Sequence, residues 1–180
     1  MENQVVQVEV TQPGADFDLT QIIDGKEIVM PSPLSIHQII SGNLFLELSL
    51  FVRKTKAGRV CTAPLDVILE DGANRVQPDL LFVRQDRLDI ISDFVRGVPD
   101  LVVEIISPSS FDIDTVDKKE LYARFGVPEY WIVAPGLKLV EVFSLEGGTY
   151  KLNNFALESG TVTSPLLPGF SVDLQSIFEG

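Results

Sequence analysis

Three charged residues stand in stretches of the chain that are otherwise apolar. Glu104 interrupts the apolar run 101–106, and Asp79 follows Pro78 at the head of another apolar run. Lys118 falls on the apolar face of a predicted helix. Burying an unpaired charge costs free energy, so each of these residues should have either a compensating partner or a chemical function.

The chemistry that suits these residue types is phosphodiester hydrolysis. Two carboxylates from adjacent strands can hold Mg²⁺ or Mn²⁺, which prefer oxygen ligands. A nearby lysine can orient or help deprotonate the attacking water and offset charge on the phosphate. We therefore predict a metal-dependent phosphodiesterase site built from Asp79, Glu104 and Lys118.

Each residue also has a structural interpretation, and these alternatives stay open. Glu104 could form a buried salt bridge with an arginine, and Asp79 could simply begin a strand. Lys118 could lay its stem on apolar surface and extend its ammonium into water. The three could also form a structural ion network in which Glu104 and Lys118 neutralise each other.

The hydrophobic patterns that must position these residues predict an α+β fold. The predicted strands are 26–30, 60–69 (as one strand or two), 75–83, 101–106, 130–133, 139–144 and 150–152. The predicted helices are 16–23, 34–56 and 114–125, with a strand and a short helix in the tail 165–178. Residues 1–16 are expected to be a loosely held lead-in with an edge strand at 5–10. We expect a central mixed sheet flanked by helices.

Several details follow from this assignment. The pairs Asp24-Gly25 and Gly147-Gly148 predict turns. Asp114 is predicted to cap its helix, with Asp117 in the first turn. The same helix should point Lys118 toward the core and Lys119 away from it. Asp100, directly before the strand 101–106, is expected to be a turn residue.

Composition sets the limits on these interpretations. A length of 180 residues suits one domain spanning 1–180. The single cysteine, Cys61, excludes an intramolecular disulfide and a cysteine-based zinc site, which fits a cytoplasmic protein. The N-terminus lacks signal-peptide features, and the apolar stretch 44–52 is too short to span a bilayer. A net charge of −12 argues against nonspecific coating of nucleic acid but not against a nuclease with a metal site.

Weaker candidates surround the three main residues. His37, the only histidine, could contact phosphate or water, or could cap its helix or lie at the surface. Glu47 or Glu27 could supply a further carboxylate. Tyr122, Tyr130 and Trp131 are expected to pack the core. One dense basic cluster could contact a phosphate backbone or form a solvated helix end: Arg53, Lys54, Lys56 and Arg59.

Longer motifs give these residues a context. The runs PDLLFV, GVPDLVVEIISPSS and KKELYARFGVPEYWIV, the last preceded by a DxxxK pattern, resemble the Uma-two family of endonucleases. That family is assigned to the restriction-endonuclease-like PD-(D/E)XK superfamily. The resemblance extends from IIDGKEIVMPSP to LPGFSVDL, which is nearly the whole chain. It implies a restriction-endonuclease-like core.

The resemblance also implies roles. Asp79 takes the place of the PD aspartate, Glu104 takes that of the (D/E), and the backbone carbonyl of Ile105 completes the metal shell. The usual lysine position is Ile106 here, so Lys118 of DxxxK is the expected replacement. The implied function is a Mg²⁺- or Mn²⁺-dependent DNA endonuclease, plausibly a homodimer. The alternative is a noncatalytic nucleic-acid- or protein-binding module on the same fold.

Overall fold

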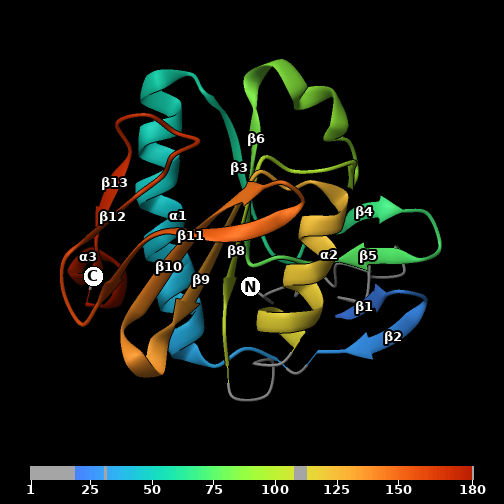
Figure 1. The fold of residues 1–180 in the computed structure, drawn as a ribbon, viewed down its shortest axis with the longest axis horizontal. Coiled ribbons are helices and arrows are strands. Elements are labelled where there is room, and N and C mark those ends of the chain that lie inside the picture. The colour runs from blue at the N-terminus through green and yellow to red at the C-terminus, as the bar shows by residue number, and fades with distance from the viewer. Residues whose placement is uncertain (1–18, 31, 108–112, 180) are drawn as a thin grey trace, which may run out of the picture.

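The structure, a computed structural model, describes residues 19–30, 32–107 and 113–179. It has the predicted mixed α+β architecture, built on a six-stranded sheet (Figure 1). The strands of this sheet, in spatial order, are β11 (Thr149–Leu157), β10 (Leu139–Glu146), β9 (Glu129–Ala134), β8 (Leu101–Ile105), β6 (Leu80–Arg84) and β3 (Gly58–Thr62). Strands β8 and β9 are parallel and the other neighbours are antiparallel, so the sheet is mixed as expected.

A second sheet has five short strands. Their spatial order is β2 (Lys26–Val29), β1 (Thr20–Ile23), β5 (Asn74–Val76), β4 (Val67–Glu70) and β7 (Val95–Arg96). A separate two-stranded ladder joins β12 (Thr161–Thr163) to β13 (Ser171–Asp173). The α-helices are α1 (Ser35–Thr55), α2 (Lys118–Phe125) and α3 (Leu174–Phe178), and 3₁₀ turns lie at Gln85–Ile90 and Pro135–Leu137.

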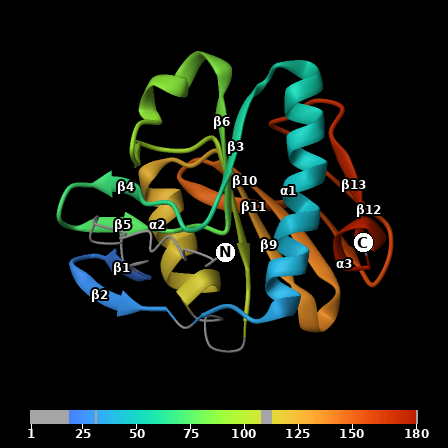
Figure 2. The same cartoon turned by 180° about the vertical axis from the view of Figure 1, so that it is seen from behind.

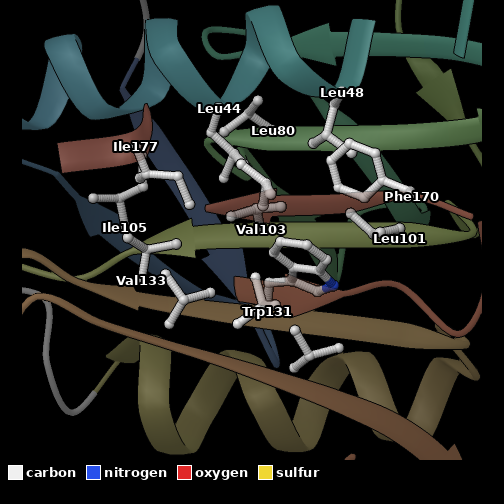
Figure 3. Close-up of a cluster of buried hydrophobic side chains, with 14 of the residues drawn as sticks. Leu44, Leu48, Leu80, Leu101, Val103, Ile105, Trp131, Val133, Phe170 and Ile177 are labelled. Atoms are coloured by element: carbon white, nitrogen blue, oxygen red, sulfur yellow. The ribbon is translucent and has the colours of Figure 1, made fainter. Parts of the chain in front are cut away.

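The six-stranded sheet separates two hydrophobic cores. Helices α1 and α3 cover one face, and α2 with the five-stranded sheet covers the other (Figure 2). Side chains alternate along a strand, so Leu101, Val103 and Ile105 of β8 pack toward α1 (Figure 3). Val102 belongs to the opposite core, and Glu104 has the same parity. All five residues of β8 are buried, which places the Glu104 carboxylate inside the protein.

Helix α1 confirms the predicted long helix. Its inner face buries Ile40, Leu44, Leu48 and Val52 at helical spacing. By length and composition alone it is the one helix in the described ranges that could cross a membrane, which by itself is weak evidence. The buried face packs in the hydrophobic core against the six-stranded sheet.

The predicted helix 16–23 is wrong over its described part. Residues Thr20–Ile23 form β1, which pairs antiparallel with β2 in the register Ile23↔Lys26. The two-residue connection is Asp24-Gly25, and both residues have positive φ (49° and 75°). This turn type joins two strands, and the local pairing overrides the weak helical pattern. The predicted strand 5–10 lies outside the described residues.

The predicted strand 75–83 is two strands in different sheets. Strand β5 ends at Val76 in the five-stranded sheet, and β6 begins at Leu80 in the six-stranded one. Pro78 lies between them and has no N–H with which to continue a ladder. The chain therefore changes sheets at Pro78, and Asp79 leads directly into β6, an interior strand of the six-stranded sheet.

Asp100, which we predicted to be a turn residue, lies at a bend directly before β8. It is fully buried, and Oδ2 accepts a hydrogen bond of 2.9 Å from the backbone N–H of Arg84. Its Oδ1 pairs with Arg84 Nε at 3.0 Å and Arg87 Nη1 at 2.7 Å. A buried carboxylate at this position has to be compensated, and Arg84 at the end of β6 and Arg87 just after it do so.

We expect Asp100→Ala to lower the free energy of unfolding by about 2–4 kcal/mol, because it leaves several charge-assisted hydrogen bonds unmade. Asp86→Ala is the matched control, since Asp86 is exposed and lies 4.0 Å from the same Arg84 Nε. The control should change stability by less than about 0.5 kcal/mol. Urea unfolding of both variants measures the difference, and equal losses would contradict a special role for Asp100.

Candidate functional site

Asp79 and Glu104 meet across two antiparallel strands. The ladder between β6 and β8 pairs Leu80 with Val103 and Leu81 with Val102. Asp79 directly precedes β6, and its carboxylate lies close enough to Glu104 on the neighbouring strand to raise the pKa of Glu104. The two carboxylates that the sequence singled out are thus brought together.

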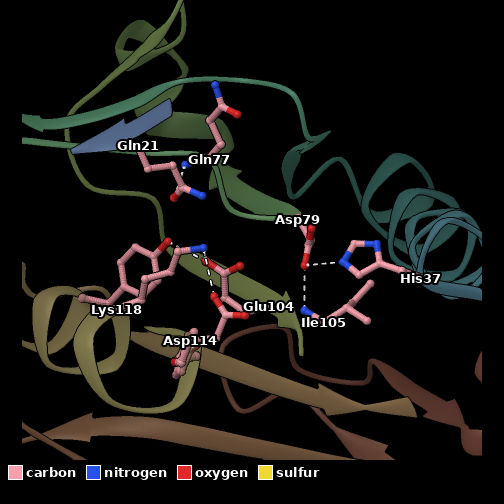
Figure 4. A network of polar contacts seen from close by, with 10 residues as sticks. Gln21, His37, Gln77, Asp79, Glu104, Ile105, Asp114 and Lys118 are labelled. Carbon is pink, nitrogen blue, oxygen red and sulfur yellow. Dashed lines mark hydrogen bonds and ion pairs between the residues drawn. The ribbon is translucent and has the colours of Figure 1, made fainter. Parts of the chain in front are cut away.

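Asp79 is held by two groups through one oxygen. Its Oδ2 accepts a 2.7 Å hydrogen bond from the backbone N–H of Ile105 and lies 3.1 Å from His37 Nε2 (Figure 4). A carboxylate only accepts hydrogen bonds, so His37 donates here. This places His37 at the site rather than at a helix cap, since the first residues of α1 carry no side-chain cap.

Glu104 is held inside the protein by α2. Its Oε1 lies 3.1 Å from Lys118 Nζ and accepts a 2.8 Å hydrogen bond from the Tyr122 hydroxyl. Lys118 Nζ is also 3.1 Å from Oδ1 of Asp114. Lys118 and Glu104 are each only 2% exposed, so Lys118 does not extend into water. The predicted inward direction of Lys118 is confirmed, and the partner of Glu104 is a lysine rather than an arginine.

A local irregularity in the helix aims Lys118 at this point. Residues Ile113–Asp117 form a π-helical turn before α2 begins. The Tyr130 hydroxyl donates a 2.7 Å hydrogen bond to the backbone carbonyl of Asp114 and fixes that turn. Asp114 is buried and ion-paired, so its predicted role as a helix cap is wrong. The neighbouring Lys119 lies over the Phe143 ring instead.

Burial and charge act together on the pKa values of this cluster. Burial, the largest influence, raises the pKa of Glu104 to about 8, and Asp114 and Asp79 act in the same direction against Lys118. Burial alone would lower the pKa of Lys118, but Glu104, Asp114 and Asp79 outweigh it and raise that pKa. The lysine therefore carries its charge throughout the neutral range.

His37 and Asp79 form the more accessible side of the site. Their side chains are 15% and 17% exposed. Burial acts most strongly on His37 and lowers its pKa, but the hydrogen bond to Asp79 and the charges of Asp79 and Asp114 reverse the effect and raise it. The second ring nitrogen, Nδ1, is buried and has no hydrogen-bond partner among the described residues. A ligand reaching the site would meet His37 and Asp79 before Glu104.

The other candidates do not join the cluster. Glu47 lies ten residues after His37 on α1, which is about 15 Å along the helix axis. Glu27 is an exposed residue of β2. The basic residues Arg53, Lys54 and Lys56 are exposed at the far end of α1, as in a solvated helix end, and Arg59 is exposed on β3. Tyr122, Tyr130 and Trp131 are core residues as predicted.

Sequence reasoning missed two members of the site. Asp114 and Lys118 are four residues apart, a spacing that brings charged side chains together on a helix and that signalled an ion pair. The Tyr122 hydroxyl lies on the same helix face one turn later. The sequence predicts a helix cap for Asp114 and core packing for Tyr122, and neither prediction indicates a place in the site.

The donor set suits a hard divalent cation. Asp79 Oδ1 and Glu104 Oε2 have no partner among the described residues, while their sister oxygens are engaged. No group of three or more His, Cys, Asp or Glu side chains in the described ranges forms a metal-binding cluster. Mg²⁺ commonly binds through one or two carboxylates and keeps several waters, so two carboxylates fit it.

Comparison with known proteins decides the family. Residues 4–175 match the model of the Uma2 family, described as "Putative restriction endonuclease". The chain belongs to the Uma2 family. The resemblance predicted from its motifs is therefore confirmed. No curated protein matches this Uma2 chain.

A solved structure supports the same fold. The crystal structure of "a putative nuclease belonging to DUF820 from Anabaena variabilis ATCC 29413" matches this Uma2 protein with a TM-score of 0.74 and 18% sequence identity, over 89% of each chain. At this identity the likeness shows the fold alone. Together with the family, it confirms the predicted nuclease-like architecture.

The shifted pKa of Glu104 should make stability depend on pH. The folded carboxyl keeps its proton between the ordinary value of 4.5 and about 8, where the unfolded one has lost it. Folding then takes up a proton, so this contribution to the unfolding free energy falls as pH rises through that window. Glu104→Gln removes the titration, and the stability difference, wild type minus variant, should shrink from pH 5.5 to 8.5.

Urea unfolding at three pH values tests this expectation in the metal-free protein. Glu146→Gln is the control, because Glu146 is exposed at the end of β10. That variant should follow the wild type at every pH. If the unfolding free energies of the wild type and of Glu104→Gln differ by the same amount from pH 5.5 to 8.5, Glu104 does not hold the proton.

Proposed function

We propose that this Uma2 protein is a divalent-metal-dependent endonuclease that hydrolyses phosphodiester bonds of DNA. One observation carries the proposal. Asp79 directly precedes β6, Glu104 lies on the neighbouring strand β8, and Lys118 Nζ lies 3.1 Å from Glu104. Membership of a family described as restriction endonucleases gives the substrate class. Homodimerisation and a cytoplasmic location stay predictions from the sequence.

Asp79 and Glu104 would hold Mg²⁺ or Mn²⁺, with the backbone carbonyl of Ile105 as a further ligand. When bound, such an ion polarises a phosphoryl oxygen and lowers the pKa of a coordinated water. His37 keeps Asp79 in place through its 3.1 Å contact, and the Ile105 N–H does the same from the strand. Both contacts leave Asp79 Oδ1 for the ligand.

Lys118 acts as a charge rather than as a base. Its raised pKa means that the ammonium keeps its proton near neutral pH, so it cannot accept one from water. A fixed cation beside Glu104 can instead orient the attacking water and stabilise negative charge on the phosphate. Of the two roles that the sequence allowed for the lysine toward the attacking water, orienting it or helping to deprotonate it, only the first remains.

His37 is the residue best placed to meet the substrate first. Its ring lies at the accessible side of the site, while Nδ1 is buried and has no protein partner in the described ranges. In its protonated form the ring would offer this donor to a phosphate oxygen once the groups that cover Nδ1 move aside. Its role is then to position Asp79 on one side and the scissile phosphate on the other.

Cleavage of supercoiled plasmid DNA with Mg²⁺ or Mn²⁺ tests the proposal. Asp79→Asn and Glu104→Gln should each reduce the cleavage rate by about 100-fold or more, since each removes a charge that holds the metal. Both variants should keep the circular dichroism spectrum of the wild type. The comparison isolates the carboxylate charge because each substitution nearly preserves side-chain shape.

Asp86→Asn and Glu47→Gln are the matched controls, since both lie away from the cluster, and they should cleave at the wild-type rate. If the wild type cuts no DNA with either metal, the noncatalytic binding module becomes the better description. Folded Asp79→Asn and Glu104→Gln variants that cut as fast as the wild type would show that the activity resides elsewhere.

A further inference from the structure

Lys118 is a buried cation between two buried acidic side chains. Its ammonium lies 3.1 Å from Glu104 Oε1 and 3.1 Å from Asp114 Oδ1, and the three side chains are between 2% and 4% exposed. In such surroundings charges interact more strongly than in water. The ammonium therefore supplies much of what makes two carboxylates tolerable on this face of the sheet.

The ammonium occupies a position between two carboxylate oxygens where a metal cation could also bind. It stands at equal ion-pair distances of 3.1 Å from these two oxygens. Glu104 Oε1 is further occupied by the Tyr122 hydroxyl at 2.8 Å. Any ion that binds Glu104 has to share the carboxylate with Lys118 or turn it away from Lys118.

We propose that Lys118 is the resident counter-cation of Glu104 and Asp114, which stabilises the metal-free protein and competes with divalent metal for Glu104. The inference rests on the metal site of the proposed function. It adds the direction in which metal affinity should change when the lysine charge is removed. Removal of the lysine charge should tighten metal binding, although a lysine that only supports the metal site would have the opposite effect.

Asp114 completes the arrangement. When Glu104 is drawn toward a metal ion, the ammonium still has Asp114 as a partner at its present distance, and the Tyr130 hydroxyl holds the backbone of Asp114. Asp114 is thus a positioning residue, which lets Glu104 change partners without leaving a buried ammonium unpaired. This accounts for the two acidic side chains beside Lys118, where one would be enough to neutralise its charge.

Isothermal titration with Mn²⁺ and thermal unfolding of Lys118→Met test the inference without measuring cleavage. Methionine fills a similar volume without charge. The dissociation constant for Mn²⁺ should fall by about tenfold or more, which corresponds to one unit in its logarithm. Without metal the variant should melt at a lower temperature than the wild type. Saturating Mn²⁺ should raise its Tm by more than it raises that of the wild type.

Lys119→Met and Tyr122→Phe are the controls. Lys119 is the adjacent lysine and lies over Phe143, 3.5 Å from the ring centroid, so its loss should leave the Mn²⁺ affinity unchanged. Tyr122→Phe removes a hydrogen bond to Glu104 but no charge, and it should change the affinity by less than Lys118→Met does. The pair separates charge competition from general loosening of the site.

The possible outcomes are distinct. If the wild type binds Mn²⁺ and the folded Lys118→Met variant binds it equally or more weakly, the inference is wrong and the proposed function stands. If neither protein binds Mn²⁺, the metal dependence in the proposed function is wrong, and the inference falls with it. If Lys118→Met is unfolded without metal, Mn²⁺ should refold it. Mn²⁺ should also refold Lys118→Gln. Failure to refold either variant would overturn the inference.

Discussion

The burial of Glu104 is the constraint on which the rest of this site depends. Strand β8 is covered on both faces, so every side chain along it must find a partner inside the protein. For the apolar members that partner is one of two cores. For Glu104 it is the end of a helix, where Lys118 and Tyr122 converge on one oxygen. The π-helical turn and the Tyr130 hydrogen bond serve the same requirement, since they set where α2 begins.

Much of the fold could be predicted because hydrophobic periodicity records burial directly. The long helix, the strand around Glu104 and the hairpin at Gly147-Gly148 were all found from pattern alone. The errors lie where a nonlocal partner decides the structure. Residues 20–23 carry no strong pattern of their own, and their pairing across Asp24-Gly25 makes them a strand. The break at Pro78 was visible in the sequence, but the change of sheet was not.

The residues of the site divide in the same way, into those that local sequence indicates and those that depend on nonlocal partners. Asp79, Glu104 and Lys118 could be grouped from residue type, position and family resemblance. The structure joins Glu104 and Lys118 in an ion pair, and Asp79 lies near enough to act on both charges. His37 is 42 residues from Asp79 in the chain, and nothing local indicates that the two would meet. Asp114 was visible but misjudged, because an acid before a helix usually caps it. The sequence pattern predicts a regular helix, and the π-helical turn that redirects the carboxylate has no simple sequence signature.

The change of sheets at Pro78 has a consequence for how the protein folds. Asp79 is attached on one side to a strand of the small sheet and on the other to a strand of the large one. The site also takes His37 from α1 on one face of the large sheet and Lys118 from α2 on the other. The two cores are therefore coupled through a few residues of chain. A partly folded protein with only one intact core would lack an assembled site, so competence for chemistry arises together with cooperative folding of the whole domain.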